Sequence, residues 1–205
     1  MTLTQLKSPH EVDTFLKQPL CAIFKAGTCH KTTQGFSVIE SFLRHYDLPM
    51  GYIRVTEERP ASNHVATLSG VVHHSPQFIL FKDGKAIFDI DNWSITAQAL
   101  EPIFRQHVPE RNASGSHVRG NLDAYTQLIE SYLSGGLTDA QFQKKYVETF
   151  RYDASLRSKE EFELLSGLFG DPDAPHGGLH QLVPAGEFPN MKDTAQHLLS
   201  QLKAL

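Results

Sequence analysis

The pattern of hydrophobic and polar positions changes near the middle of the chain. Up to about residue 106, short apolar runs typical of strands alternate with segments in which apolar residues recur every three or four positions, as in helices. Beyond residue 120 only the helical spacing recurs. The pattern therefore predicts an α/β part followed by an all-α part.

Seven elements are predicted in the first part, in the order β-α-β-α-β-β-α. The predicted strands cover residues 20–25, 51–55, 77–82 and 85–90, and the predicted helices cover residues 33–45, 62–70 and 95–106. Asp83-Gly84, between the last two strands, is typical of a two-residue hairpin turn. Crossovers followed by a hairpin and a closing helix predict a mixed sheet with helices on both faces. The thioredoxin fold is the compact architecture with this order.

Four helices are predicted in the second part, residues 121–205. A glycine pair marks the C-terminus of the first helix, and two capping boxes mark the N-termini of the second and third helices. These signals are Gly135-Gly136, Thr138 with Gln141, and Ser158 with Glu161. The fourth predicted helix covers residues 191–205. Because no alternating β-branched run intervenes, we expect a small four-helix bundle.

Between the two parts the sequence is polar. Residues 107–120 contain Pro109, Gly115 and Gly120 and have no apolar periodicity. We therefore expect a thioredoxin-like domain at residues 1–108, a linker at residues 109–120 and a helical domain at residues 121–205.

The composition agrees with two small soluble domains. The chain has 205 residues, of which 40% are hydrophobic and 20% charged. It has no apolar run long enough to span a membrane and no segment with the pattern of a signal peptide. We expect a cytoplasmic protein without a membrane contact.

The charge is distributed unevenly. Residues 1–116 contain 11 basic and 11 acidic residues, whereas residues 117–205 contain 8 basic and 12 acidic residues, which accounts for the whole net charge of -4. A nucleic-acid-binding protein normally has a basic excess, so no direct nucleic-acid contact is expected. The surplus acidity belongs to the helical part.

Cys29 is the first candidate for chemistry, because it follows a predicted strand and precedes a predicted helix. A sulfur there lies near unpaired backbone N–H groups and the positive end of the helix dipole, which favour a nucleophilic thiolate. Lys25, His30 and Lys31 would add positive potential from a flexible loop. The alternative is that Cys29 is only a small residue at a turn. Cys21 lies inside the first strand and is expected to pack in the core.

Pro76, in the segment Ser75-Pro76-Gln77, precedes another predicted strand. A proline at a strand entrance cannot donate to the ladder, and a cis peptide bond there would turn the chain tightly. In thioredoxin-type folds such a proline faces the active cysteine. An ordinary trans turn is the alternative.

The histidines raise the question of a metal site at Cys29, His30, His73 and His74. Adjacent residues such as Cys29 and His30 rarely coordinate the same ion. We therefore expect no metal and no cofactor.

Taken together, these signals make residues 1–108 resemble the monothiol bacilliredoxin family, which has a thioredoxin fold. The motifs that carry the resemblance are Phe24-Lys25, Thr28-Cys29, Arg59-Pro60-Ala61-Ser62-Asn63, His73-His74-Ser75-Pro76-Gln77, Asp83-Gly84-Lys85 and Trp93-Ser94-Ile95-Thr96. The resemblance implies a thiol at Cys29 that forms a mixed disulfide with a low-molecular-weight thiol or a protein. It places Pro76, Thr32 and His73 in the same catalytic site.

One departure from the family is at the active loop. The family has Cys-Pro-Ile-Ser, whereas this chain has Cys29-His30-Lys31-Thr32. A resolving cysteine is absent from both. The departure leaves open a competent redox thiol and a scaffold without activity.

The helical part resembles the colicin D type of immunity protein. The carriers are Leu128-Ile129, residues 132–138, Phe142 with Tyr146, residues 168–174, and Leu198, Leu199, Leu202 and Leu205. The resemblance implies inhibition of a toxin nuclease or tRNase domain by blocking its active site. Acidic side chains would suit such a basic site. The candidate partner-binding residues are Glu160, Glu161, Glu163, Asp171 and Asp173; alternatively, they are solvated helix faces and a capping loop.

The sequence leaves three hypotheses for the function. The favoured hypothesis is an immunity-type protein whose helical domain binds and neutralises a toxin. The alternative is a thiol-disulfide oxidoreductase that acts through Cys29, with the helical domain recruiting clients. The third is a pair of interaction scaffolds without turnover.

Overall fold

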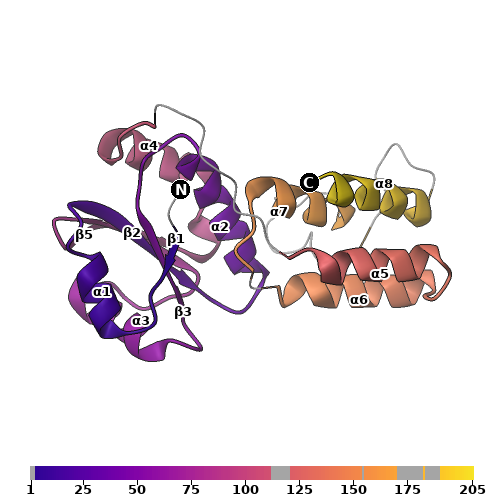
Figure 1. Ribbon diagram of the computed structural model, residues 1–205, viewed down its shortest axis with the longest axis horizontal. Coiled ribbons are helices and arrows are strands. Elements are labelled where there is room, and N and C mark those ends of the chain that lie inside the picture. Colours follow the sequence, from indigo (N-terminus) through magenta and orange to yellow (C-terminus); the bar gives the residue numbers. More distant parts are fainter. Residues whose placement is uncertain (1–2, 112–120, 154, 170–181, 183–189) are drawn as a thin grey trace.

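The computed structural model describes residues 3–111, 121–153, 155–169, 182 and 190–205. It contains an α/β unit, residues 3–111, and a helical unit formed by the described residues from 121 onward. The two units lie side by side, and helix α2 of the α/β unit faces the helical unit (Figure 1). The predicted fold class, a thioredoxin-like domain followed by four α-helices, is confirmed.

The α/β unit contains five strands and four α-helices. In chain order they are β1 (Leu3–Gln5), α1 (Pro9–Phe15), β2 (Leu20–Ala26), α2 (His30–Leu43), β3 (Met50–Arg54), α3 (Arg59–Ser69), β4 (Gln77–Lys82), β5 (Lys85–Asp91), the 3-10 turn η1 (Asn92–Ser94) and α4 (Ala97–His107). The seven predicted elements are present. The sequence pattern missed β1 and α1, because three strand residues and a seven-residue helix are too short to show a period.

The sheet has the strand order β1-β3-β2-β4-β5. Strands β1, β3 and β2 are parallel, whereas β4 is antiparallel to both β2 and β5. The β4–β5 turn has positive φ angles of 50° at Asp83 and 73° at Gly84, as the Asp-Gly pair predicted. Parallel strands followed by an antiparallel hairpin form the thioredoxin-like arrangement.

Each face of the sheet is covered by one pair of helices. Alternation along β2 sends Phe24 to the cluster that α2 and α4 cover, and sends Cys21 and Ile23 to the cluster that α1 and α3 cover. Helices α2 and α3 both begin where a parallel strand ends, so their N-termini meet at the carboxyl edge of the sheet. Ligands of open α/β sheets bind at this edge.

The helical unit contains the four predicted helices. They are α5 (Asp123–Leu133), α6 (Asp139–Arg151), α7 (Lys159–Ser166), which continues into the 3-10 turn η2 (Gly167–Phe169), and α8 (Met191–Ala204). Both predicted capping boxes form, at Thr138 with Gln141 and at Ser158 with Glu161. Gly135 has a φ of 85°, which is why a glycine ends this turn after α5.

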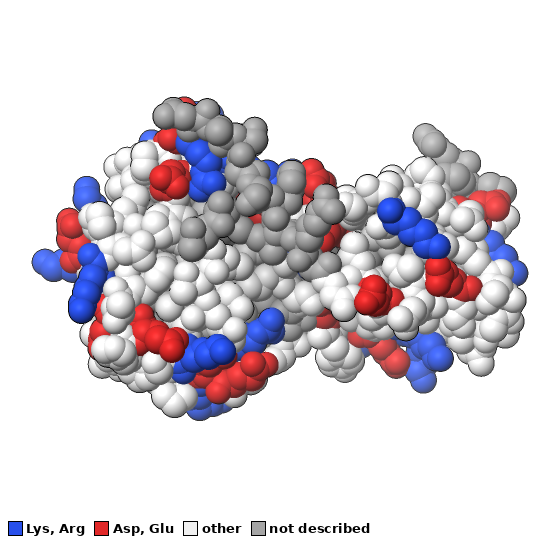
Figure 2. Space-filling model, viewed as in Figure 1, with Lys and Arg blue, Asp and Glu red and all other residues white. Residues whose placement is uncertain are grey.

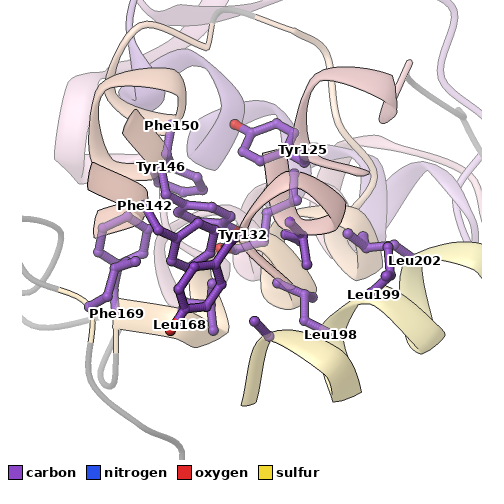
Figure 3. Packing of buried hydrophobic residues seen from close by; sticks show 14 of the residues in the cluster. Tyr125, Tyr132, Phe142, Tyr146, Phe150, Leu168, Phe169, Leu198, Leu199 and Leu202 are labelled. Atoms are coloured by element: carbon purple, nitrogen blue, oxygen red, sulfur yellow. The ribbon is translucent and has the colours of Figure 1, made fainter. Parts of the chain in front are cut away.

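The core of the helical unit is rich in aromatic side chains. Tyr132 and Phe142 stack with ring centroids 4.2 Å apart, and Tyr146 and Phe169 extend the cluster (Figure 3). Leucines of α8 close the other side, as Figure 3 shows. The hydroxyl of the fully buried Tyr146 donates to the carbonyl of Leu165 at 2.9 Å. The core is therefore separate from those of the α/β unit.

Part of the expected linker is attached to the α/β unit. The amide of Asp47 donates to the carbonyl of Pro109 at 2.8 Å, and the amide of Arg111 donates to the carbonyl of His45 at 2.7 Å. Residues 112–120 lie outside the described residues. The proposed domain limits at residues 108 and 121 stay a prediction.

Among the helices of the described residues, none is both long enough and apolar enough to cross a membrane.

Candidate active site

Cys29 lies between the end of β2 and the beginning of α2. It is the N-cap residue of α2. This helix begins at His30, three residues earlier than predicted. Cys29 is partly exposed, and its side chain makes no capping hydrogen bond to the first turn. The carbonyl of Cys29 instead accepts from the amide of Thr32 at 2.8 Å. The backbone thus fixes the turn and leaves the sulfur available.

The Ser75–Pro76 peptide bond is cis, so the tight turn rather than the ordinary trans turn is correct. Gly27 lies against it: a Cβ atom added at Gly27 would be 3.4 Å from the Ser75 hydroxyl and 3.1 Å from Thr32 Oγ1. Thr32 is buried, and its Oγ1 has no hydrogen-bond partner. The structure therefore brings the loop before Cys29, Thr32 and the Ser75–Pro76 turn together.

Lys25 lies in the strand predicted at residues 20–25, but its burial was not predicted. It is the second-last residue of β2 and is 0% exposed, so it is not on a flexible loop. Its Nζ lies 2.6 Å from Nδ1 of His73. Lys25 has no acidic partner among the residues that the structure describes. A lysine ammonium in this place is buried without a compensating negative charge.

Gln77 holds His73 over Lys25. The fully buried Gln77 pairs with Lys25 across β2 and β4. Its side-chain amide donates to the carbonyl of Val72 at 3.0 Å, and its Oε1 accepts from the amide of His74 at 3.4 Å. These two bonds fold the chain around His73. Gln77 is part of a motif noted in the sequence, but the sequence did not indicate these two hydrogen bonds.

The environment of the Lys25–His73 pair is positive. Burial lowers the pKa of Lys25 from 10.5 to about 8. Burial also lowers the pKa of His73, and the charges of Lys25, Arg59 and His74 lower it further. All the charges that act on His73 in this way have the same sign. These positive charges therefore disfavour a proton on His73.

The helical unit contacts the first turn of α2. The hydroxyl of Thr33 donates to the carbonyl of Asp153 at 2.8 Å, and Nδ1 of His30 lies 3.4 Å from the carbonyl of Arg151. Since a carbonyl only accepts, Nδ1 of His30 carries the hydrogen in this bond. The end of α6 is thus fixed beside the residue that follows Cys29.

Two aromatic rings, one from each unit, lie close to the ring of His30. Its ring centroid is 5.6 Å from that of Trp93 in η1 and 6.2 Å from that of Phe150, which belongs to the core of the helical unit. The ammonium of Lys31 lies over Trp93, 5.3 Å from the ring centroid. The residues that depart from the family motif therefore contact η1 and the helical unit.

A second buried network supports this contact from inside the helical unit. The Asp153 carboxylate accepts from the Tyr125 hydroxyl, from Arg157 Nε and from the Ser155 amide, at 2.9, 2.9 and 2.8 Å. Burial alone would raise the pKa of Asp153, but Arg157 and the bonds from Ser155 and Arg157 hold it below its usual value. The sequence analysis did not identify Asp153 or Arg157.

The predicted acidic cluster does not form one free surface. Glu160 pairs with Arg44 of α2 at 3.0 Å, and Glu163 lies 3.4 Å from Lys159. Glu161 is 3% exposed, and its carboxylate accepts from the Ser158 amide, so it serves the helix cap. The assignment of Glu161 to a partner-binding surface stays a prediction. Asp171 and Asp173 lie outside the described residues. On the face in Figure 2, acidic and basic side chains are interspersed over the helical unit.

Cys21 packs in the core as expected. It is 0% exposed, and burial raises the pKa of its thiol to about 12. It lies near the start of β2, roughly 17 Å along the strand from its end, at about 3.3 Å per residue. A disulfide requires Cα atoms within about 7 Å. Cys21 therefore cannot act as a partner for Cys29 in the folded chain.

Within the described part of the chain, no group of three or more His, Cys, Asp or Glu side chains is arranged to hold a metal ion.

Comparison with known proteins gives one family match. Residues 4–100 match the family model of the monothiol bacilliredoxin BrxC, which is just under half of the chain. The match includes Cys29, Thr32, His73 and Pro76. It does not extend into the helical unit.

Solved structures with thioredoxin folds are similar to the same part. A proposed oxidoreductase with a thioredoxin fold is 24% identical, covers 49% of this chain and 91% of its own, and has a TM-score of 0.45. A mutant thioredoxin from Halobacterium salinarum NRC-1 is 17% identical over 51% and 89%, with a TM-score of 0.43. Thioredoxin f2 of Chlamydomonas reinhardtii is 15% identical over 54% and 100%, with a TM-score of 0.43.

Proposed function

We propose that the protein is a monothiol thiol-disulfide oxidoreductase that acts through Cys29. The observation that carries the proposal is the partly exposed Cys29 at the N-cap of α2, in the loop that packs against the cis Ser75–Pro76 turn. The first turn of a helix directs N–H groups and positive dipole charge toward this position. The family match of residues 4–100 supports the same assignment.

The reaction has two exchange steps. The Cys29 thiolate attacks one sulfur of a mixed disulfide; the S–S bond breaks, a new disulfide forms on Cys29, and the leaving thiolate takes a proton from water. A second, external thiolate then attacks the Cys29 adduct and releases the reduced Cys29. The external thiol supplies the electrons and becomes the oxidised product, so the protein itself ends unchanged.

The second step requires an external thiol because the chain has only two cysteines and Cys21 is buried near the far end of β2. This separates the proposed reaction from that of dithiol thioredoxins, in which a second cysteine of the same chain resolves the adduct.

A mass measurement tests the proposal. Reduced wild-type protein and a Cys21→Ala control are incubated with bis(2-hydroxyethyl) disulfide, and the intact mass is determined. We expect one 2-mercaptoethanol adduct per chain in both proteins, removed by added thiol, and no adduct in Cys29→Ser. An adduct on Cys29→Ser, or none on the folded wild-type protein, would overturn the proposal. Circular dichroism verifies that each variant is folded.

Toxin binding by the helical unit stays a prediction. It rests on the sequence resemblance of residues 121–205, whereas Glu160 and Glu161 are engaged in contacts within this chain. The Cys29→Ser variant should retain any such binding, because Cys29 lies in the other unit.

A further inference from the structure

The first turn of α2, directly after Cys29, is closed by one backbone bond but has no side-chain cap. The amide of Thr32 donates to the carbonyl of Cys29, whereas the Cys29 side chain caps nothing. Among the described residues, the buried Thr32 Oγ1 has no hydrogen-bond partner either. A first turn without a cap is the part of a helix that frays most readily. A proline at the first helical position would fix the turn through its ring, but this position is His30.

The later turns of α2 are fixed within the α/β unit. Gly35 lies close to Ile95, because an added Cβ atom would be 3.1 Å from the Ile95 Cδ1. Phe36 and Ile39 are fully buried in the core on this face of the sheet. Side chains in a close-packed core have little freedom to move. The first turn, residues 30–33, contributes no side chain to this core.

The helical unit holds the first turn instead. The hydroxyl of Thr33 donates to the carbonyl of Asp153 at 2.8 Å, and Nδ1 of His30 lies 3.4 Å from the carbonyl of Arg151. These two carbonyls lie two residues apart at the end of α6. Asp153 is itself held in place, because its carboxylate accepts three hydrogen bonds from other groups of the helical unit. The acceptor for Thr33 is therefore rigid.

The contact between the units continues along α2. The buried carboxylate of Glu40 accepts from the amide of Lys159, the first residue of α7, at 3.3 Å. Further along, Arg44 pairs with Glu160 at 3.0 Å. Figure 1 shows α2 facing the helical unit. Loss of one bond at the first turn should therefore loosen that turn without separating the units.

We propose that Thr33 is a positioning residue for exchange at Cys29. Its bond to Asp153 holds the first turn of α2 in the geometry that directs N–H groups and positive dipole charge toward the sulfur. Because the thiolate is the nucleophile, a loosened turn should slow the attack on a disulfide. The helical unit thus acts on the reaction through α2. This inference rests on the proposed thiol-disulfide exchange and adds the role of the second unit in it.

The rate constant of adduct formation with bis(2-hydroxyethyl) disulfide, followed by intact mass at pH 7, tests this role. We expect Thr33→Val to react about three- to fivefold more slowly than the wild type, as for the loss of one hydrogen bond. Thr33→Ser retains the hydroxyl and should react at nearly the wild-type rate. Thr67→Val, which removes a hydroxyl bond within α3, is the matched control and should leave the rate unchanged. Circular dichroism verifies that each variant is folded.

A second background separates positioning from a general loss of stability. His30→Pro introduces a residue whose ring fixes the first turn, and Cys29, with φ -143° and ψ 171°, has the extended backbone that a following proline requires. In this background the first turn no longer depends on the helical unit. Adding Thr33→Val should then change the rate constant by less than about 1.5-fold. A merely structural effect would give the same slowing in both backgrounds.

The outcomes separate the two proposals. If the folded wild-type protein forms no adduct, the proposed function fails. If Thr33→Val reacts as fast as the wild type, or Thr33→Ser as slowly as Thr33→Val, exchange at Cys29 stands and the positioning role is overturned. Equal slowing by Thr33→Val with His30 and with His30→Pro would overturn it as well.

Discussion

Two buried charges, one in each unit, have opposite surroundings. In the helical unit, Asp153 and Arg157 are 8% and 3% exposed and bond to each other at 2.9 Å, and the Tyr125 hydroxyl and the Ser155 amide donate to Asp153 as well. In the α/β unit, Lys25 is fully buried against only a histidine nitrogen. The charge of Asp153 is thus compensated by Arg157, whereas the charge of Lys25 has no opposite charge beside it.

The presence or absence of a compensating charge distinguishes a buried group that stabilises the fold from one that a binding site retains. A compensated buried pair stabilises its surroundings only while both partners are present, and removing one leaves the other exposed to a low dielectric. An uncompensated buried charge lowers stability from the start, which is typical of sites that are organised for a ligand. Neutralising each charge should therefore change the free energy of unfolding with opposite sign.

The largest effect is expected for Asp153→Asn. This change leaves Arg157 buried without its carboxylate and should lower the free energy of unfolding of the helical unit by about 3 kcal/mol at pH 7. Urea unfolding followed by helical circular dichroism measures it. Glu163→Gln, which removes an exposed pair with Lys159, is the control and should have almost no effect.

The pH dependence of Asp153→Asn has a defined sign. Because the folded-state pKa of Asp153 lies below its ordinary value of 3.8, its contribution is complete above that value and is lost as the pH falls through the folded-state pKa. The difference between wild type and variant should therefore shrink in acid. A variant as stable as the wild type at pH 7 would contradict the compensated network.

A smaller effect of opposite sign is expected for Lys25→Met. Removing the buried ammonium should raise the free energy of unfolding by about 1–3 kcal/mol at pH 7. Above pH 8 the wild-type lysine loses its proton in the folded state while the unfolded chain still binds one, up to about 10.5, so the wild type gains stability as the pH rises. The advantage of the variant should shrink over this range.

The exposed Lys82 at the end of β4 offers the control, since Lys82→Met buries nothing and removes no buried charge. Denaturant unfolding at pH 7 and pH 9.5 measures both variants. If Lys25→Met destabilises the α/β unit at pH 7, the ammonium is not an uncompensated charge.

The smallest effect is expected where the two units meet. Thr33→Val keeps the shape of the side chain but removes its bond to the Asp153 carbonyl, which should cost about 1 kcal/mol. Trp93, the single tryptophan, contacts His30 beside this bond and reports on the contact by fluorescence. Thr67→Val, which removes a bond within α3, should leave the Trp93 signal unchanged. An unchanged signal in Thr33→Val would show that this bond does not couple the units.

Local signals in the sequence predicted most of the fold. The Asp83-Gly84 turn, the two capping boxes and the glycine pair after α5 each depend on neighbouring residues, and the structure contains all of them. Local signals could not predict contacts between residues that are distant in the sequence. The pairing of Lys25 with His73, 48 positions away, depends on the strand register that places Lys25 opposite Gln77.

Charge patterns were the weakest guide to the site. Glu160, Glu161 and Glu163 are neighbours in the sequence, but one pairs with α2, one caps its own helix and one pairs with Lys159. The partner of Glu160 depends on how α7 packs against α2, which a run of acidic residues does not reveal, whereas Glu161 and Glu163 have partners within or next to their own helix. The position of Cys29 was predictable because a strand end and a helix start fix it locally.

The ring contacts of His30 make the two halves of the chain depend on each other. His30 follows Cys29 directly, yet its ring contacts Trp93 of one unit and Phe150 of the other. A proline at this position would have neither the imidazole ring nor its bond to Arg151. The loop of Cys29 and the end of α6 therefore constrain each other's sequence, so replacing one of these two segments would require a matching change in the other.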